Sequence, residues 1–369
     1  MTALNCKQPF ILLPTRVWRA YRGGKLLDEI EEKPDPRDTN FPEDWIGSAT
    51  RAINGGREEI EEGIATARSA DGTEIRMDVL FQSHAEEVLG PAHLAAYGAQ
   101  PQLLVKFIDS SVRLHIQAHP SVDWSLKHLN DNKGKTEAWW ILGSRGDDPY
   151  VYFGFQRPPQ PREWGRMMKE QDIDAMLSCF DRIPVEPGDV LLIKGGVPHA
   201  IGEGLFLLEI QEPTDYVVKS EYTLAGVTVS ESTATMQRGV DRILDLFDYT
   251  TYPADRVKGT FGPRRRVVQK SSDGMEEVLL ERPQTDRVEV RSLVVHTEVA
   301  PETDGRYSIL VVLEGSGSVT ANNITVPVGQ WSKVFIPACI TDLRCSGSLK
   351  LARCLPPKPD SPSHAEFPG

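Results

Sequence analysis

Residues 113–120, with the sequence RLHIQAHP, carry three side chains that could bind a metal. Apolar residues alternate there with His115, Gln117 and His119. Successive residues of a β-strand point to opposite faces, so a strand would place these three side chains on one face. Imidazole nitrogen suits zinc and related first-row metals, and an amide or carboxylate oxygen can complete the ligand set. The stretch therefore predicts one half of a metal site; the alternative it leaves open is a polar sheet face turned to water.

Two lysines lie in segments whose other residues indicate strands. Lys106 stands inside the apolar run 103–108, and alternation over 135–142 would place Lys135 and Glu137 on a common face. A lysine in an apolar run is seldom fully buried without a partner. Lys106 is therefore either on an edge strand, where its ammonium reaches water, or a cation aimed into a cavity.

Composition limits the classes of partner. The chain has 369 residues, enough for about two or three domains. Its 40% hydrophobic and 25% charged residues are typical of a soluble globular protein. A net charge of -12 and a pI of about 5.3 disfavour generic binding to nucleic acid or to an anionic membrane, while a local basic pocket for a small anion stays possible. We expect a small-molecule partner, no nucleic acid and no membrane; the sequence does not indicate an oligomeric state.

Cysteine usage and the absence of long apolar runs favour a cytoplasmic protein. The cysteines are odd in number and form no CxxC pair, which argues against a disulfide framework or a cysteine-rich zinc site. The N-terminus has no basic region followed by an apolar run, and no apolar segment is long enough to span a bilayer. The five cysteines are Cys6, Cys179, Cys339, Cys345 and Cys354.

The pattern of elements is mainly β with helices in the first two thirds. Apolar spacing predicts helices over about 77–99, 121–131 and 161–180. From about residue 263 onward short strands recur at intervals of about ten residues, as in a β-sandwich. A connection that contains proline and glycine lies between these two regions. We place the domain boundary there, which gives units 1–255 and 256–369. The stretch 28–42 predicts a surface loop and the stretch 53–76 a loop with a hairpin, both long and without an evident role.

A second potential ligand sits in a motif that indicates a fold. Gly188, Gly196 and His199 are spaced G-x7-G-x2-H after a Pro-Gly-Asp turn. This resembles the second conserved motif of the cupin superfamily, whose fold is a small double-stranded β-helix that holds a metal inside. Residues 310–337 resemble a second cupin without the histidine. The resemblance implies two cupin-like jelly-roll domains, with helical insertions in the first and no metal ligands in the second.

Longer blocks resemble one family, the class I (zinc-dependent) mannose-6-phosphate isomerases, and especially their short bacterial members. The blocks follow the order of that family and span residues 104–215, and weak similarity extends over the whole chain. They read LVKF at 104–107, IQAHP at 116–120, GKTEAW at 134–139, PHAIG at 198–202 and LEIQ at 208–211.

The resemblance implies a zinc site. Carried over residue by residue, the ligands are one amide, two imidazoles and one carboxylate, which leaves room for water or a sugar oxygen at an open position. His115 then remains as a neighbour of the ligands. The implied ligands of Zn²⁺ are Gln117, His119, Glu137 and His199.

The resemblance also implies catalytic residues, with one departure. Lys106 and Lys135 match lysines near the site of the family, and Asp215 matches an acidic residue there. Four residues after that aspartate the family has an arginine, and this chain has Lys219. A guanidinium offers a fork of fixed donors, whereas an ammonium is a flexible point charge. The charge is kept and the geometry is not, so the departure bears on the choice of substrate.

The expected reaction is the interconversion of mannose 6-phosphate and fructose 6-phosphate through a cis-enediol. Zinc would act as a Lewis acid on the sugar oxygens, and the lysines would bind phosphate or stabilise the enediolate. A carboxylate or His115 would carry the proton, and the sequence does not choose between them. Two alternatives stay open: a related cupin isomerase that acts on another sugar phosphate, and a sugar-binding cupin without turnover.

Overall fold

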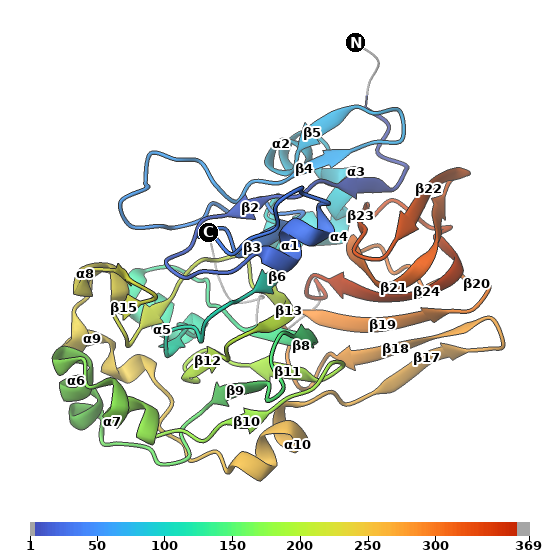
Figure 1. Cartoon of the computed structure of the whole chain (residues 1–369). Helices are drawn as coiled ribbons and strands as arrows, with labels where there is room; N and C mark the ends of the chain where they lie inside the picture. The colour runs from blue at the N-terminus through green and yellow to red at the C-terminus, as the bar shows by residue number, and fades with distance from the viewer. Residues whose placement is uncertain (1–3, 360–369) are drawn as a thin grey trace.

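The computed structural model describes residues 4–359, and within them β-strands dominate (Figure 1). The strands form antiparallel sheets of eleven, six, five and two strands. The green and teal strands of the middle of the chain and the orange and red strands of its last third lie in adjacent halves of the molecule (Figure 1). The expectation of a mainly β chain is therefore confirmed, whereas the division at residue 255 stays a prediction.

The half of the molecule that contains the middle of the chain is a sandwich of the six-stranded and the five-stranded sheet. Their facing sides share one apolar core, to which Trp139 and Leu207 come from the first sheet and Val151 and Ile201 from the second. The six-stranded sheet runs β11 (Val190–Ile193), β8 (Glu137–Ser144), β13 (Leu205–Gln211), β6 (Leu104–Asp109), β3 (Glu43–Ile46), β2 (Arg16–Val17). The five-stranded sheet runs β10 (Ile183–Pro184), β9 (Tyr150–Phe153), β12 (His199–Ile201), β7 (Gln117–Ala118), β14 (Val218–Lys219).

The eleven-stranded sheet combines the two ends of the chain. β1 from the N-terminal segment pairs with β23, with Phe10 opposite Phe335, and β4 and β5 extend the sheet beyond it. Its path is β17 (Arg266–Lys270), β18 (Gly274–Leu280), β19 (Glu289–Val295), β24 (Arg344–Leu355), β21 (Ser308–Ala321), β23 (Lys333–Ile336), β1 (Phe10–Leu12), β4 (Thr66–Arg68), β5 (Glu74–Arg76). The strands beside this path are β20 (Glu298–Val299) and β22 (Ile324–Gly329), and the separate hairpin is β15 (Thr223–Leu224) and β16 (Val227–Thr228).

The three helical stretches that the sequence predicts are helical, and local capping fixes their ends. Ser121 caps α5 by accepting a hydrogen bond from the Trp124 N–H (3.2 Å), and Asp172 caps α7 in the same way. Pro161 opens α6, where its missing N–H is not needed. The helices are α1 (Lys25–Ile30), α2 (Met77–Ser83), α3 (Ala85–Leu89), α4 (Pro91–Tyr97), α5 (Val122–Leu129), α6 (Pro161–Glu170), α7 (Ile173–Ser178), α8 (Glu231–Ala234), α9 (Val240–Ile243), α10 (Val257–Phe261) and the short 3₁₀ turns η1 (Leu244–Leu246) and η2 (Ala254–Arg256).

The strand expected over 113–120 is wrong in its first half. Only Gln117 and Ala118 are paired as β7; the chain before them is irregular. The Ile116 N–H donates to the carboxylate of Glu221 (2.7 Å) rather than to a neighbouring strand. Arg113 holds the same carboxylate with both terminal nitrogens, at 2.6 and 2.7 Å. At the Ile116 N–H a side chain has therefore replaced the backbone partner that the alternating pattern suggested, although the Leu114 N–H still donates to the carbonyl of Ile201 (2.9 Å).

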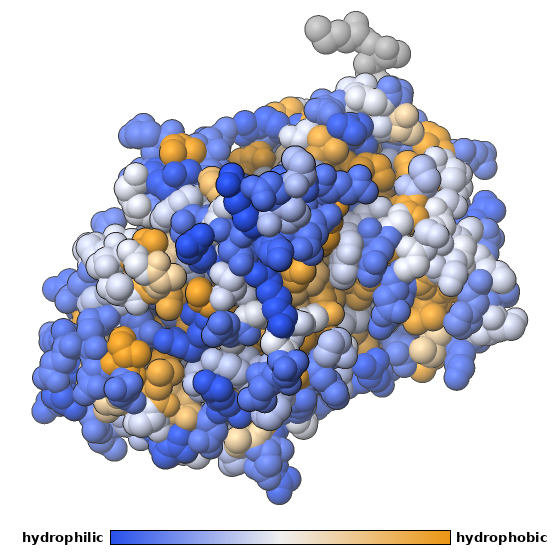
Figure 2. Space-filling model, in the orientation of Figure 1, coloured by the Kyte–Doolittle hydropathy of each residue, from blue (hydrophilic) through white to orange (hydrophobic). Residues whose placement is uncertain are grey.

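The stretch 28–42 is only partly a loop, because it begins within α1. In the stretch 53–76 the predicted hairpin is confirmed as the antiparallel pair of β4 and β5. Ile53, in this second stretch, is among the few large apolar side chains left exposed, at 63%. Most of the visible surface is hydrophilic, with apolar patches between (Figure 2). Within residues 4–359, no helix combines the length and the apolar character that crossing a membrane requires.

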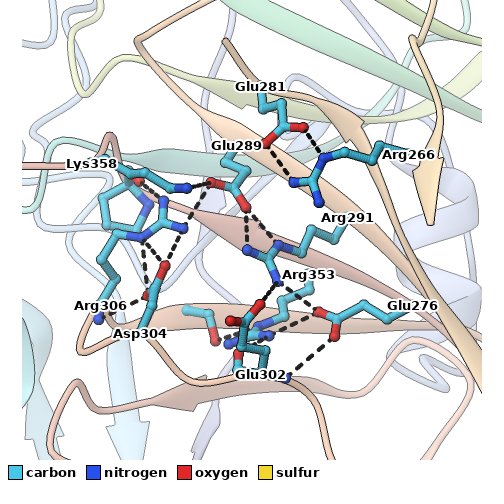
Figure 3. A network of polar contacts seen from close by, with 12 residues as sticks. Arg266, Glu276, Glu281, Glu289, Arg291, Glu302, Asp304, Arg306, Arg353 and Lys358 are labelled. Carbon is cyan, nitrogen blue, oxygen red and sulfur yellow. Dashed lines mark hydrogen bonds and ion pairs between the residues drawn. The ribbon is translucent and has the colours of Figure 1, made fainter. Parts of the chain in front are cut away.

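A buried network of arginines and carboxylates lies on the eleven-stranded sheet (Figure 3). Glu276 on β18 accepts from Arg291 on β19 (3.1 Å) and from Arg353 on β24 (3.0 Å). Glu289 accepts from Arg306 (2.8 Å) and also pairs with Arg291. Each of these side chains is at most 5% exposed. Buried charges are tolerated when every one of them is paired, so the network is a fully connected polar core.

Candidate metal centre

Three side chains from separate strands converge at the junction of the six-stranded and the five-stranded sheet. His119 directly follows β7, Glu137 opens β8, and His199 opens β12. Their ligand atoms all lie within 4.8 Å of one another, and all three residues are buried. The distance from His119 Nε2 to Glu137 Oε2 is 3.2 Å, and that from His199 Nε2 to Glu137 Oε1 is 3.3 Å. The group therefore presents two imidazole nitrogens and a carboxylate to one point.

Backbone carbonyls fix the two histidine rings. His119 Nδ1 lies 2.8 Å from the carbonyl oxygen of Tyr216, and His199 Nδ1 lies 2.8 Å from that of Val197. A carbonyl only accepts, so Nδ1 carries the proton and Nε2 keeps its lone pair toward Glu137. Burial, and then the charge of Lys135, lowers the pKa of His119 to about 4. Burial also lowers the pKa of His199. Both rings are thus neutral at neutral pH, the form that binds metals.

The carboxylate of Glu137 shows that the group fits a metal ion. Among residues 4–359 neither of its oxygens receives a hydrogen bond, although the residue is fully buried. Burial acts to raise the pKa of Glu137, but the charge of Lys135 and the contacts with the two histidines offset this and hold it well below the ordinary value. The Lys135 ammonium lies 2.9 Å from Glu137 Oε2 and 2.9 Å from His119 Nε2. The Lys135 ammonium already provides a cation for this buried carboxylate, and two imidazoles with one carboxylate are in addition a donor set that zinc accepts.

Gln117, the fourth predicted ligand, lies beside this group. It stands opposite His199 in the pairing of β7 with β12, and its Nε2 is 3.4 Å from His199 Nε2. Rotation of the amide by half a turn exchanges its nitrogen and oxygen, so the oxygen can face the same point. The structure thus brings the side chain to the group, and its role as a ligand stays a prediction.

Lys106 is not on an edge strand. It lies on β6, between β13 and β3, and is 2% exposed. Its ammonium pairs with Glu209 Oε2 at 2.8 Å and lies 4.8 Å from the centre of the Trp45 ring. Of the two interpretations of this lysine, the cation that faces a cavity is therefore the correct one.

An inner pocket lies beside the group, and the predicted catalytic residues line it. An outer cleft of about 640 Å³, bordered by Ile53, Thr233 and Arg238, shares lining residues with it. Asp215 and Lys219 line both spaces. The polar residues of the inner pocket are Arg19, Tyr21, Glu43, Lys106, His115, Gln117, His119, Lys135, Glu209, Asp215 and Lys219.

His115 lines this pocket with a buried imidazole. It is 2% exposed, and within the described part of the chain its Nε2 has no hydrogen-bond partner. Burial, and then the charges of Lys219 and Arg113, lowers its pKa to about 3. The ring is therefore a neutral imidazole beside the predicted metal site.

Sequence reasoning missed Arg19, which reaches the pocket just after β2. Its two terminal nitrogens donate to Asp215 at 3.0 and 3.1 Å, and its Nε lies 2.9 Å from Glu43 Oε2. Burial acts to lower the pKa of Arg19, but the charges of Asp215 and Glu43 outweigh it and raise the pKa well above its ordinary value. Its segment holds three arginines in seven residues, Arg16, Arg19 and Arg22, and nothing in their spacing indicates which one is buried.

The fold and the buried His–Glu–His group define a β protein with a metal-type site, and known structures share this fold. Mannose 6-phosphate isomerase from Bacillus subtilis matches with a TM-score of 0.74 and 19% identity, over 94% of this chain and 99% of that one. A mutant of phosphomannose isomerase from Salmonella typhimurium matches with a TM-score of 0.71 and 14% identity, over 95% and 100%. The fold is therefore that of the phosphomannose isomerases.

Sequence comparison points to the same enzymes. No model of a protein family matches the chain. A protein of Bacillus subtilis named as a probable mannose-6-phosphate isomerase is 24% identical over 92% of this chain and 96% of its own length. Mannose-6-phosphate isomerase ManA of the same organism is 33% identical over 31% of this chain and 34% of its own length. These relatives bear out the expectation of an enzyme of the isomerase class.

Proposed function

We propose that the chain is a metal-dependent aldose–ketose isomerase that interconverts mannose 6-phosphate and fructose 6-phosphate. The observation that carries the proposal is the buried His119–Glu137–His199 group, whose two neutral imidazoles and one carboxylate lie within 4.8 Å of one another at a pocket rich in lysine. A binding protein for a neutral sugar has no need of a buried carboxylate and two neutral imidazoles aimed at one point.

The metal of the proposal is Zn²⁺, held by Gln117, His119, Glu137 and His199. When bound, it supplies Lewis-acid stabilisation of negative charge on sugar oxygens. The donor set supports this choice, because nitrogen and oxygen ligands in this number suit zinc. The histidine rings are already oriented by their Nδ1 hydrogen bonds, which reduces the cost of ordering them.

The charges of the site support a phosphorylated sugar. The four cationic and four carboxylate side chains balance one another, so a divalent metal leaves the site with two positive charges. A phosphate monoester carries about -1.5 to -2 at pH 7, which complements that charge. The eight side chains are Arg19, Lys106, Lys135, Lys219, Glu43, Glu137, Glu209 and Asp215.

Within this proposal His115 moves the proton between C1 and C2 through the enediol. The sequence leaves a carboxylate as the alternative, but Lys106 already holds Glu209 and Arg19 holds both Glu43 and Asp215. His115 offers a neutral ring whose Nε2 has no partner within residues 4–359. Lys106 and Lys135 contribute fixed positive charge close to the reacting oxygens, which favours an enediolate.

The finer description of the fold is also part of the proposal. We take the first half, residues 1–255, as a cupin-like jelly roll with helical insertions and the metal site, and residues 256–369 as a second one without ligands. The pairing of β1 with β23 means that the first unit also contributes strands to the sheet of the second. All five cysteines are free thiols, which supports a reducing compartment such as the cytoplasm.

The test is a coupled assay of metal-analysed protein with mannose 6-phosphate, with and without a chelator. We expect fructose 6-phosphate to form, to stop when the chelator removes the metal, and to resume when Zn²⁺ is returned. Turnover of a different hexose phosphate alone would move the assignment to a related isomerase. Metal binding without turnover of any sugar phosphate would contradict the proposal and favour the non-catalytic sugar-binding cupin.

A further inference from the structure

Three of the four cations at the inner pocket have a carboxylate partner, and one does not. Lys106 pairs with Glu209, and Lys135 pairs with Glu137, at 2.8 and 2.9 Å. Arg19 pairs with Asp215 and Glu43. Within residues 4–359 no carboxylate lies within 4.0 Å of the Lys219 ammonium. Lys219 is therefore the cation of the pocket that is available to an anionic ligand.

Arg19 occupies Asp215, a carboxylate that lines the same spaces as that lysine. Asp215 lies four residues before Lys219 and lines the same spaces. Both oxygens of Asp215 accept from the Arg19 guanidinium, and the Ile53 N–H donates to Oδ2 at 2.7 Å. Such a bidentate pair is among the stronger and more directional contacts that a carboxylate makes. Asp215 therefore has no oxygen left without a donor.

Arg19 is itself held by further contacts besides Asp215. Its Nε pairs with Glu43, and its guanidinium lies 5.0 Å from the centre of the Trp45 ring. Its NH1 also donates to Asn54 Oδ1 at 3.1 Å. Asn54 and Ile53 belong to the stretch 53–76, for which the sequence suggests no role. Residues of this loop therefore help to hold both Arg19 and Asp215 in place.

We propose that Arg19 is a positioning residue: it captures the carboxylate of Asp215 and so keeps the Lys219 ammonium free to bind the phosphate group of the substrate. The inference rests on the proposed function. If Arg19 is removed, the pocket contains one carboxylate without a cation and one ammonium without a carboxylate, and the two attract each other. Their ion pair then competes with the phosphate.

The experiment is a double-mutant cycle on metal-loaded protein. Its readouts are the binding of inorganic phosphate by calorimetry and the separate values of kcat and KM for mannose 6-phosphate. We expect Arg19→Gln to weaken phosphate binding and to raise KM about tenfold or more, the usual effect of losing a charge-assisted contact, with a smaller change in kcat. In the Lys219→Met background, Arg19→Gln adds no further loss of phosphate affinity.

A matched control and a conservative variant separate this role from a structural one. Arg68→Gln breaks the exposed ion pair with Glu74 in the same stretch, without touching Asn54 or Asp215, and leaves phosphate binding unchanged. If Arg19→Gln does not fold, Arg19→Lys tests the same point, because one ammonium cannot hold both oxygens of Asp215 and Glu43 together. Thermal melting checks the folding of each variant.

Additive losses in the cycle, or unchanged phosphate affinity in Arg19→Gln or Arg19→Lys, overturn the inference. The proposed function fails in a different way. If the unmodified protein turns over no hexose phosphate but its phosphate affinity still falls in a non-additive cycle, the isomerase assignment is wrong and the role of Arg19 at an anion site stands. If turnover is normal and the cycle is additive, the isomerase stands and the role of Arg19 is wrong.

Discussion

Glu137 shows what single residues contribute to this site. A buried carboxylate is unfavourable unless a cation neutralises it, and here the Lys135 ammonium pairs with it while two neutral imidazoles share the space. Its neighbours His119 and His199 are recognisable in the sequence because ligand types and short local spacings survive in the linear pattern. Arg19 is not recognisable in this way, because its contact with Asp215 crosses 196 positions of the chain. Ligand residues can thus be predicted from the sequence where their motif is local. The partner of a residue cannot be predicted where the two lie far apart in the sequence.

Removal of the His199 ring should remove the metal. We expect His199→Ala to weaken zinc binding by well over about tenfold, since even the loss of a group that only orients a ligand typically costs about 10–100-fold. Activity should disappear with the metal. Zinc analysis of the purified variant checks this, with exposed His296→Ala as the control that keeps full zinc. Full zinc occupancy together with normal turnover in His199→Ala would show that the ligand assignment is wrong.

Loss of the His115 imidazole should affect the reaction and leave the metal in place. General acid–base groups typically contribute about 10²–10⁴ in rate, so we expect His115→Gln to lower kcat by a factor in that range. KM and zinc content should stay close to those of the unmodified protein, because Gln fills similar space and His115 is not a predicted ligand. Steady-state kinetics with zinc analysis is the measurement. A kcat within a few-fold of the unmodified protein would assign the proton transfer to another group.

At the scale of elements, alternation of apolar residues locates strands well when the strand is central. β13 occupies residues 205–211, all of them buried, as the run LFLLEIQ suggests. The stretch 113–120 alternates as clearly, yet only two of its residues pair, because Glu221 binds the backbone there. The competing carboxylate lies 105 residues away in sequence from the Ile116 N–H that it binds. Sequence periodicity contains no information about such a competitor.

The network on β18, β19 and β24 permits a sharp test of a buried charge. Glu276→Gln leaves Arg291 and Arg353 buried with one negative charge fewer, and breaking a buried pair on one side typically costs about 3–5 kcal/mol. The adjacent Glu277 pairs with Arg265, which is half exposed, so Glu277→Gln should cost less than about 1 kcal/mol. Urea unfolding of both variants checks the difference. If both variants lose the same free energy of unfolding, the buried arginines of the network in Figure 3 do not depend on the charge of Glu276.

At the scale of the whole molecule the two halves depend on each other. One apolar core contains Phe107 and Trp140 from the six-stranded sheet as well as Ile309 and Phe335 from the eleven-stranded sheet. The composition of the sequence correctly indicates a mainly β chain with helices in the earlier part. It does not indicate that β1, β4 and β5 join the sheet formed by the last third, because the choice of strand partners is a long-range property.

This shared construction predicts that residues 256–369 do not fold alone. The isolated fragment lacks β1, so the edge of β23 is unpaired and the apolar face around Phe335 is open to water. We expect circular dichroism to show no cooperative thermal transition for the fragment, whereas the full chain has one. A cooperative melt of the fragment would establish 256–369 as an independent domain and would support the boundary that the sequence suggests.

The position of β1 also constrains the order of events during synthesis. Phe10 pairs with Phe335, so the ribosome makes 325 further residues after the first partner before the second exists. At about 5–20 residues per second this interval is roughly 15 to 65 seconds. Throughout it, β1 has an apolar side and an unpaired edge, which are the features that attract other nascent chains. Closure of the eleven-stranded sheet is therefore a late step in the biogenesis of the protein, and chaperones that shield the first strand have their longest opportunity here.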